Sequence, residues 1–216
     1  MDAAIKDRPI LFNGPMVRAI LEGRKSQTRR VAKPIKHPDW GNLYTPGALI
    51  IEKESDDVIK RSCPYGSSGD RLWVRETFIG PLFPSDLPED HLSSKYLTPE
   101  YCHYKASGDS CEYVDMDDNI AQKWTPSIHM PRWASRILLE ITNIRIERLD
   151  NISEDDAVAE GAARTDELNG CADDIDSARH AYKLIWESIN GKGSWDTNPF
   201  VWVIGFKVVN IRGDQT

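Results

Sequence analysis

The sequence predicts an α+β protein in which helices flank a small β-barrel. Three observations lead to this fold class: strand-like segments recur along the chain, two helical patterns with one apolar face interrupt them, and a long apolar run occupies 200–209. The chain has 216 residues, of which 40% are hydrophobic, so it is long enough to bury a sizeable core. We expect a single domain over residues 1–216 that carries a long polar insertion at about 80–123.

The first predicted elements are a strand and a helix. Pro9–Phe12 is short and apolar, which is typical of a strand. The helix opens at Asn13-Gly14-Pro15, since proline suits a first helical turn, and it ends at Gly23. Further along, Ala48–Glu52 and Val58–Arg61 are predicted to pair as a hairpin.

The segment Gly69–Thr77 alternates in character and is predicted to be a strand. Leu72 and Val74 share one face, and Glu76 falls on the same face. If this face looks into the core, the Glu76 carboxylate is buried and costly without a partner. Two interpretations stay open: a structural ion pair, or a carboxylate that takes part in the chemistry.

Two further strands are predicted in the middle of the chain. Tyr101–Ala106 is a short candidate inside the polar insertion. Ile137–Leu149 has a strong strand pattern, and its inward positions change parity near Thr142–Asn143, which predicts a bulge.

The last third of the chain is predicted to hold two helices and a strand. Ser153 is the expected N-cap of a helix that carries Glu160 and ends at Gly161. Ile175–Ile189 has the spacing of an amphipathic helix, and Phe200–Val209 is apolar enough to be a buried final strand.

The formal net charge of −7 argues against a protein that coats nucleic acid with its whole surface. The charge is uneven, however, because residues 17–36 hold seven basic side chains against one acid, Glu22. A local anion site therefore fits within an acidic protein. No apolar run approaches the length of a membrane span and the first residues do not resemble a leader, so we expect a cytoplasmic protein without membrane contact.

The cysteines do not form a metal-binding pattern. Cys63, Cys102, Cys111 and Cys171 are scattered, without a CxxC pair, and their spacing fits no common zinc template. We expect free thiols of a reducing compartment, no metal and no cofactor.

The first candidate site is the stretch GRKSQTRR at 23–30, in which Lys25 precedes Thr28 by three residues. One interpretation is a solvated basic turn after a helix. The other is a catalytic pair in which neighbouring cations disfavour the Lys25 ammonium, so that its amine takes the Thr28 proton. Residues three apart in a strand face opposite ways, so the pair converges only if the chain turns near Lys25–Ser26. Arg24 and Arg29 are candidates for contact with the ligand.

The second candidate is the loop 124–136, which combines two indoles, an imidazole and two guanidiniums with two prolines. Aromatic planes stack on bases and arginines contact phosphates or base edges, so this loop is a candidate for base binding. The alternative is that the indoles cover one end of the core and the arginines form surface ion pairs. The residues concerned are Trp124, His129, Arg132, Trp133 and Arg136.

Two single residues complete the candidates. By composition alone, Glu160 at the end of an acidic helix is a solvated carboxylate. Trp195 lies in the turn-rich segment 193–200, where it either shapes a loop or borders a pocket.

The stretch GRKSQTRR resembles the GxKxxTxR signature that opens ASCH domains, a family similar to the PUA domains, which are β-barrels that bind RNA. A longer set of blocks resembles a phage and prophage branch of this family. In chain order these blocks are PILF, GRKSQTRR, CPYGSSGDRLWVRETF, WTPSIHMPRWASR, ISEDDAVAEG and SWDTNPFVWV. The resemblance implies an ASCH, PUA-like barrel.

Some small bacterial ASCH proteins are N4-acetylcytidine amidohydrolases with a K-x-x-T motif and a helical glutamate. By position, the resemblance assigns these roles to Lys25, Thr28 and Glu160. It implies that Thr28 attacks the acyl carbonyl, that Lys25 is its base and that Glu160 handles protons. Arg29 and nearby backbone N–H groups would stabilise the oxyanion.

The implied partner is a nucleoside, or single-stranded nucleic acid that contains a modified base. The chain is about twice as long as those small enzymes, so two rival functions stay open. One is a non-catalytic RNA- or DNA-binding module. The other is a phage nucleic-acid modification factor or nuclease, which would need Glu76 and Glu160 close together.

Overall fold

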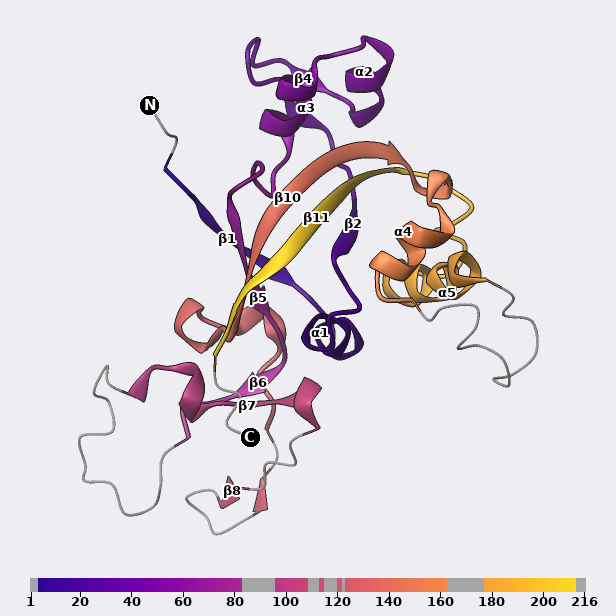
Figure 1. Ribbon diagram of the computed structural model, residues 1–216. Helices are drawn as coiled ribbons and strands as arrows, with labels where there is room; N and C mark the ends of the chain where they lie inside the picture. The colour runs from indigo at the N-terminus through magenta and orange to yellow at the C-terminus, as the bar shows by residue number, and fades with distance from the viewer. Residues whose placement is uncertain are drawn as a thin grey trace. The chain divides into compact units, whose positions relative to one another are not determined.

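The computed structural model describes residues 4–82, 96–108, 113–114, 120–121, 123–162 and 177–212. The chain divides into two compact units, which are described separately. Unit 1 contains Met1–Leu21, Arg71–Glu140 and Val208–Thr216, and unit 2 contains Glu22–Asp70 and Ile141–Lys207. The two longest strands are β10 (Ile137–Arg148) and β11 (Phe200–Ile211) (Figure 1). Each of them contributes residues to both units.

Three strands of unit 1 pair in the order β1-β5-β10. β1 (Asp7–Leu11) runs parallel to β5 (Arg71–Arg75), and β5 runs antiparallel to the start of β10. Leu72 and Val74 are buried, as the alternation of this segment predicted. The predicted first helix is α1 (Gly14–Leu21), which buries its apolar stripe. The sequence predictions for both strands and for this helix are therefore confirmed.

The remaining elements of unit 1 are short. β6 (Phe78–Ile79) pairs with β7 (His103–Tyr104), and β8 (Tyr113–Val114) pairs with β9 (Ile120–Ala121). Single 3-10 turns make up much of the rest: η2 (Pro99–Tyr101), η3 (Lys105–Ser107), η4 (Ser127–His129) and η5 (Arg132–Ala134).

The predicted strand Tyr101–Ala106 is correct only for its two central residues. Pro99 favours a turn before it because its ring fixes φ, and Gly108 takes a left-handed conformation that ends the turn after it. Parts of the predicted insertion, 83–95 among them, lie outside the described residues.

In unit 2, β10 continues beside β11, and β11 runs antiparallel to β2 (Gln27–Val31) with Ile204 opposite Thr28. The complete strand order is β1-β5-β10-β11-β2. This order is that of an open sheet among the described residues, and it confirms the mixed α+β class. Closure of the sheet into a barrel stays a prediction.

The predicted change of parity in β10 is confirmed by its burial. Ile141 and Ile144 are both buried, whereas Thr142 and Asn143 between them are exposed. The Asn143 Oδ1 accepts a hydrogen bond from the Gly205 N–H at 3.1 Å, so this side chain links the irregular part of β10 to β11.

The predicted hairpin at 48–61 is wrong, because this segment forms two helices, α2 (Pro46–Ile51) and α3 (Asp56–Ser62). Pro46 occupies the first turn of α2, and the Ser55 Oγ caps α3 by accepting from the Val58 N–H at 3.3 Å. These capping signals outweigh the short apolar runs. The neighbouring hairpin instead consists of β3 (Ile35–Lys36) and β4 (Leu43–Tyr44).

The two predicted late helices are α4 (Glu154–Ala159) and α5 (Ala178–Asn190), which contact each other in unit 2. The Ser153 Oγ accepts from the Asp156 N–H at 3.1 Å, so this predicted cap is confirmed. The predicted start of the second helix at Ile175 lies outside the described residues. A 3-10 turn, η6 (Leu149–Asn151), joins β10 to α4.

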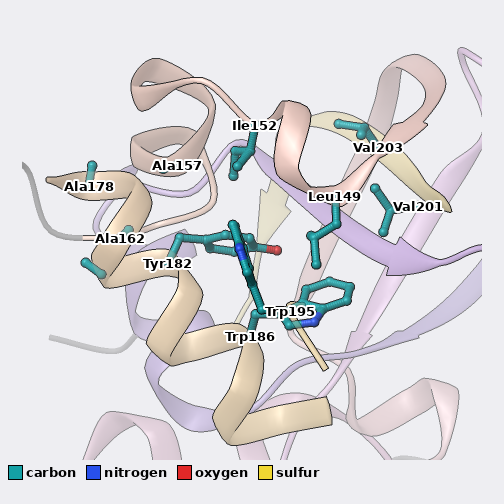
Figure 2. Packing of buried hydrophobic residues seen from close by; sticks show 11 residues of the cluster. Leu149, Ile152, Ala157, Ala162, Ala178, Tyr182, Trp186, Trp195, Val201 and Val203 are labelled. Carbon is teal, nitrogen blue, oxygen red and sulfur yellow. The ribbon is translucent and has the colours of Figure 1, made fainter. Parts of the chain in front are cut away.

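An apolar cluster holds α4 and α5 against β11. Figure 2 shows Tyr182, Trp186 and Trp195 together, with Val201 and Val203 of β11 at the same cluster. β11 is buried over 201–206 and exposed beyond, so the prediction of a buried last strand is confirmed for its first half. None of the described helices has the length and apolar character to span a bilayer.

The close approach at Gly205 generates a stability prediction. A Cβ on Gly205 would collide with the Asn143 side chain, so Gly205→Ala should lower the free energy of unfolding by about 1–3 kcal/mol. Gly14→Ala is the control, because a Cβ there would meet no atom closer than 3.6 Å. Urea unfolding of both variants measures the difference, and equal midpoints would contradict the prediction.

Candidate functional site

Lys25 and Glu160 lie side by side in unit 2 although 135 residues separate them. Their backbones form an isolated β-bridge, and the Ser26 N–H donates to the Ala159 carbonyl at 2.9 Å. The Lys25 Nζ donates to Glu160 Oε2 at 2.8 Å and to the Glu160 carbonyl at 2.7 Å. The Lys25 side chain is 0% exposed and that of Glu160 is 1% exposed. The end of α4 therefore delivers a carboxylate to an amine in a dry environment.

Arg29 holds the other oxygen of the same carboxylate. Its Nη1 donates to Glu160 Oε1 at 3.2 Å. Its Nη2 donates to Glu147 Oε1 at 2.6 Å and to Asp156 Oδ2 at 2.9 Å. One buried guanidinium thus joins carboxylates from β10, from α4 and from the residue that ends α4.

An outer layer completes this network. Arg145 donates to Glu147 Oε2 at 3.0 Å, to Asp156 Oδ2 at 2.8 Å and to Gln27 Oε1 at 3.2 Å. Gln27 in turn donates to Asp156 Oδ1 at 3.2 Å. With Lys25 charged, three cations face three carboxylates, so the network balances its own charge. We call these residues the ionic network: Lys25, Gln27, Arg29, Arg145, Glu147, Asp156 and Glu160.

Burial decides the protonation of Lys25. Removal from water lowers the pKa of its ammonium more than the Glu160 carboxylate raises it, and Arg30 and Arg29 lower it further. For Arg29, burial also opposes the charge, but the carboxylates of Glu160 and Glu147 outweigh it and raise the pKa. Arg29 therefore keeps its charge, whereas burial holds the pKa of Lys25 below its ordinary value.

Thr28 is buried in β2, one residue before Arg29. Its Oγ1 has no hydrogen-bond partner within the described part of the chain, and so it is not bonded to the Lys25 amine. Lys25 lies before β2 begins at Gln27. The structure thus brings Lys25 and Glu160 into contact and leaves the Thr28 hydroxyl buried and unbonded.

Arg24, the other candidate of this stretch, lies apart from the ionic network. Its side chain is 46% exposed and forms an ion pair with Glu22. A weak hydrogen bond at 3.5 Å joins it to the Gly161 carbonyl. A surface pair of this kind contributes little to stability, so Arg24 keeps its charge available to an anionic ligand.

Glu76 and Arg136 pair with each other in unit 1. The guanidinium donates to both carboxylate oxygens, at 2.9 and 3.1 Å, and both side chains are buried. Arg136 also lies 4.0 Å from the Tyr104 ring centroid and donates to Ser107 Oγ at 2.8 Å. The inward direction of Glu76 is thus confirmed, and its environment supplies the structural ion pair that the sequence left open.

The other candidates of the loop 124–136 have different environments. Trp133 makes an edge-to-face contact with Phe78 at 6.4 Å, and Trp124 is half-buried. His129 is exposed, and Arg132 pairs with Asp7 at 3.2 Å on the surface.

Trp195, the predicted loop-tip residue, belongs to the apolar cluster of unit 2, where it contacts Tyr182 edge-to-face at 6.3 Å (Figure 2). The predicted site residues therefore belong to two different units. Lys25, Thr28, Glu160, Arg24, Arg29 and Trp195 are in unit 2, and the others are in unit 1.

Sequence reasoning missed Glu147, Asp156 and Arg145. A signal for Arg145 and Glu147, both in β10, was present in the sequence. After the parity changes near Asn143, these two residues share the polar face of the strand, opposite buried Ile144 and Ile146. No signal indicated that this polar face would meet α4.

No group of three or more potential metal ligands occurs among the described residues. Cys63 is buried and Cys102 is half-buried, and neither forms a disulfide. Burial raises the pKa of Cys102 to about 12, so its thiol stays protonated at neutral pH. Cys111 and Cys171 lie outside the described residues.

No family model and no curated protein matches the sequence. Two solved structures are similar in fold. The first is an ASCH domain from Lactobacillus crispatus JV V101, with 11% identity, a TM-score of 0.38, and coverage of 95% of this chain and 80% of that one. The second is a DUF984 protein from Enterococcus faecalis V583, with 10% identity, a TM-score of 0.41, and coverage of 98% and 80%. At TM-scores below 0.5, these similarities carry no argument about function.

The pairing of Glu76 with Arg136 generates a prediction about unit 1. Arg136→Met removes the guanidinium that pairs with the buried Glu76 carboxylate and should cost about 3–5 kcal/mol of unfolding free energy. The double variant Arg136→Met, Glu76→Leu removes both charges and should recover most of that loss. Denaturant unfolding of the two variants measures it, and additive losses in the double variant would show that the two side chains do not depend on each other.

Proposed function

We propose that this chain is an ASCH, PUA-like protein that binds a nucleoside or nucleic-acid base and hydrolyses an N4-acyl group from cytidine or a related modified base. One observation carries the proposal: the buried Lys25 amine contacts the Glu160 carboxylate, next to a stretch in which the Thr28 hydroxyl is buried without a partner. These are the three residues that the motif resemblance assigns.

The state of Thr28 supports a chemical role. A buried hydroxyl that lacks a hydrogen bond costs about 1–3 kcal/mol, so a purely structural position would favour valine over threonine. A nucleophile, by contrast, needs an oxygen that no protein group already holds. Thr28 meets that requirement in this structure.

The proposed reaction has two stages. The Thr28 oxygen attacks the acyl carbon as its proton passes to the neutral Lys25 amine. The bond from the acyl carbon to N4 then breaks, and the proton that Lys25 took from Thr28 passes by way of the Glu160 carboxylate, its hydrogen-bond partner, to the leaving cytosine amine. Water cleaves the resulting Thr28 ester, releases the carboxylic acid and restores the hydroxyl.

The ionic network supports these roles through charge. Burial favours the neutral amine that a base requires at Lys25. Arg29 binds Glu160 Oε1 and so fixes the carboxylate with its other oxygen toward Lys25. Both terminal nitrogens of Arg29 are engaged by carboxylates, so its Nε, which is buried without a partner in the described part of the chain, is the donor that remains for an oxyanion.

A non-catalytic nucleic-acid-binding module is the second candidate. The observation in its favour is that the Lys25, Arg29 and Glu160 side chains are at most 1% exposed, as expected of a structural ion cluster. In that case the exposed Arg24 would contact phosphate while the ionic network only stabilises the fold. Turnover decides between the two.

Hydrolysis of N4-acetylcytidine tests the proposal, with released cytidine followed by chromatography. Thr28→Val should abolish turnover, with a loss of at least about a hundredfold, since it removes the nucleophile. The same variant should leave the unfolding free energy equal or higher, because it removes a buried unpaired hydroxyl. Thr45→Val, at an exposed threonine of unit 2, is the matched control and should keep wild-type turnover.

Lys25→Met and Glu160→Gln should also lose turnover, but each breaks a buried ion pair and therefore needs its stability measured in parallel. Absence of turnover by the wild-type protein would reject the enzymatic proposal. Undiminished turnover by Thr28→Val would reject the assigned nucleophile.

The state of Lys25 also predicts a pH dependence. The amine acts as a base only when neutral, and its folded pKa lies below its ordinary value of 10.5. Turnover should therefore rise with pH and level off before pH 10.5. The pH profile of kcat for N4-acetylcytidine measures this, and a rate that still climbs in proportion to hydroxide beyond that point would argue against Lys25 as the base.

A further inference from the structure

The outer face of β5 in unit 1 presents an indole between arginines. In the parallel pair of β1 and β5, Arg71, Trp73 and Arg75 alternate with buried Leu72 and Val74, so the three share the outward face. All three are half-buried. Arg71 and Arg75 are four positions apart along the strand, a distance of about 13 Å between their Cα atoms, with Trp73 midway.

A third arginine reaches the same indole from the loop 124–136. The Arg132 guanidinium carbon lies 5.8 Å from the Trp73 ring centroid, and that of Arg75 lies 5.6 Å from it. Both distances are within the range of a cation–π contact. Arg132 remains 48% exposed, and its pair with Asp7 is a surface ion pair that water and salt weaken.

The residues opposite Trp73 in the two neighbouring strands are apolar. Pro9 of β1 and Leu138 of β10 lie opposite it in the two strand registers. The acids of this face lie at its margin: Asp7, which pairs with Arg132, and Glu140, which is opposite Arg71. The centre of the face is therefore a half-buried indole with two guanidiniums near its ring, of which that of Arg75 also donates to the Ile128 carbonyl.

We infer that this face binds single-stranded nucleic acid, with an unpaired base on the Trp73 indole and the flanking phosphates on Arg75, Arg132 and Arg71. Stacking needs an accessible π-surface, and the backbone on each side of a stacked base needs a cation. A duplex hides its base faces, so only its phosphates could use this surface. An acidic chain of net charge −7 can bind in this way because the cations are local.

This surface is separate from the residues of the proposed hydrolysis, all of which belong to unit 2. The inferred ligand is a single nucleic-acid strand with unmodified bases, and no acylated base is required. Binding to oligonucleotides without modified bases therefore gives a result whether or not the chain hydrolyses N4-acetylcytidine.

Fluorescence anisotropy of the full chain with fluorescein-labelled 12-nucleotide RNA and DNA strands tests the inference. We expect the single strands to bind more tightly than the matching duplex. Trp73→Ala should weaken single-strand binding roughly 5- to 150-fold, which is the contribution of one stacked base. Arg75→Ala and Arg132→Ala should each reduce the slope of log affinity against log salt by about 1.

Trp40→Ala is the matched control, because this indole is 65% exposed but stacks on His37 in unit 2. It should bind the strands like the wild type. Trp73→Phe keeps a ring and should lose less affinity than Trp73→Ala, so it replaces the alanine variant if that one does not fold. The inference is overturned if Trp73→Ala, or the double variant Trp73→Phe, Arg132→Ala, binds the strands with wild-type affinity. It is also overturned if the duplex binds as tightly as the single strands, or if the chain binds a protein ligand and no nucleic acid.

Discussion

The burial of an amine and a guanidinium against one carboxylate is the constraint on which the structure of unit 2 depends. Lys25 and Arg29 each take one oxygen of Glu160, and none of the three side chains is more than 1% exposed. Charges of this kind are stable away from water only when partners and hydrogen bonds replace their hydration. The positions of β2, β10 and the end of α4 relative to one another must therefore be fixed to within the length of a hydrogen bond.

The apolar cluster of unit 2 holds these elements together. Tyr182 and Trp186 of α5 pack with Trp195 and with the valines of β11 (Figure 2). β11 pairs directly with β2, and α4 contacts both α5 and β2. The hydrophobic effect is not directional, so it supplies stability while the ionic network specifies the alignment. Burial next to Glu160 also raises the pKa of Tyr182, which keeps its phenol neutral inside the cluster.

Both units bury an arginine with a glutamate, and the comparison shows what is unusual about the ionic network. Arg136 and Glu76 satisfy each other with two parallel hydrogen bonds, which is the expected geometry of a structural pair. Glu160 is instead divided between Arg29 and Lys25, and burial pushes Lys25 toward its neutral form. A divided carboxylate in contact with an amine of lowered pKa is an arrangement suited to proton transfer.

The local elements could be predicted from the amino-acid sequence, because helix caps and strand alternation act over a few residues. Ser153, Gly161 and the alternation around Leu72 were read correctly for this reason. The prediction was wrong at 48–61, where apolar runs suggested strands but the segment forms helices. The stronger signals there were Pro46 in the first helical turn and the N-cap at Ser55. The mixed α+β class followed from such elements and is confirmed, whereas closure into a barrel depends on pairing between distant strands.

The candidate site was only partly accessible from sequence. Motif resemblance pointed to Lys25, Thr28 and Glu160, but composition alone favoured a solvated turn and a solvated carboxylate for them. The burial of Glu160 against Lys25 and the contacts of Arg145 with the same network could not be predicted, because they join segments more than 100 residues apart. Whether a charged side chain meets water or a partner is set by what packs over it, and no local pattern in the chain encodes that.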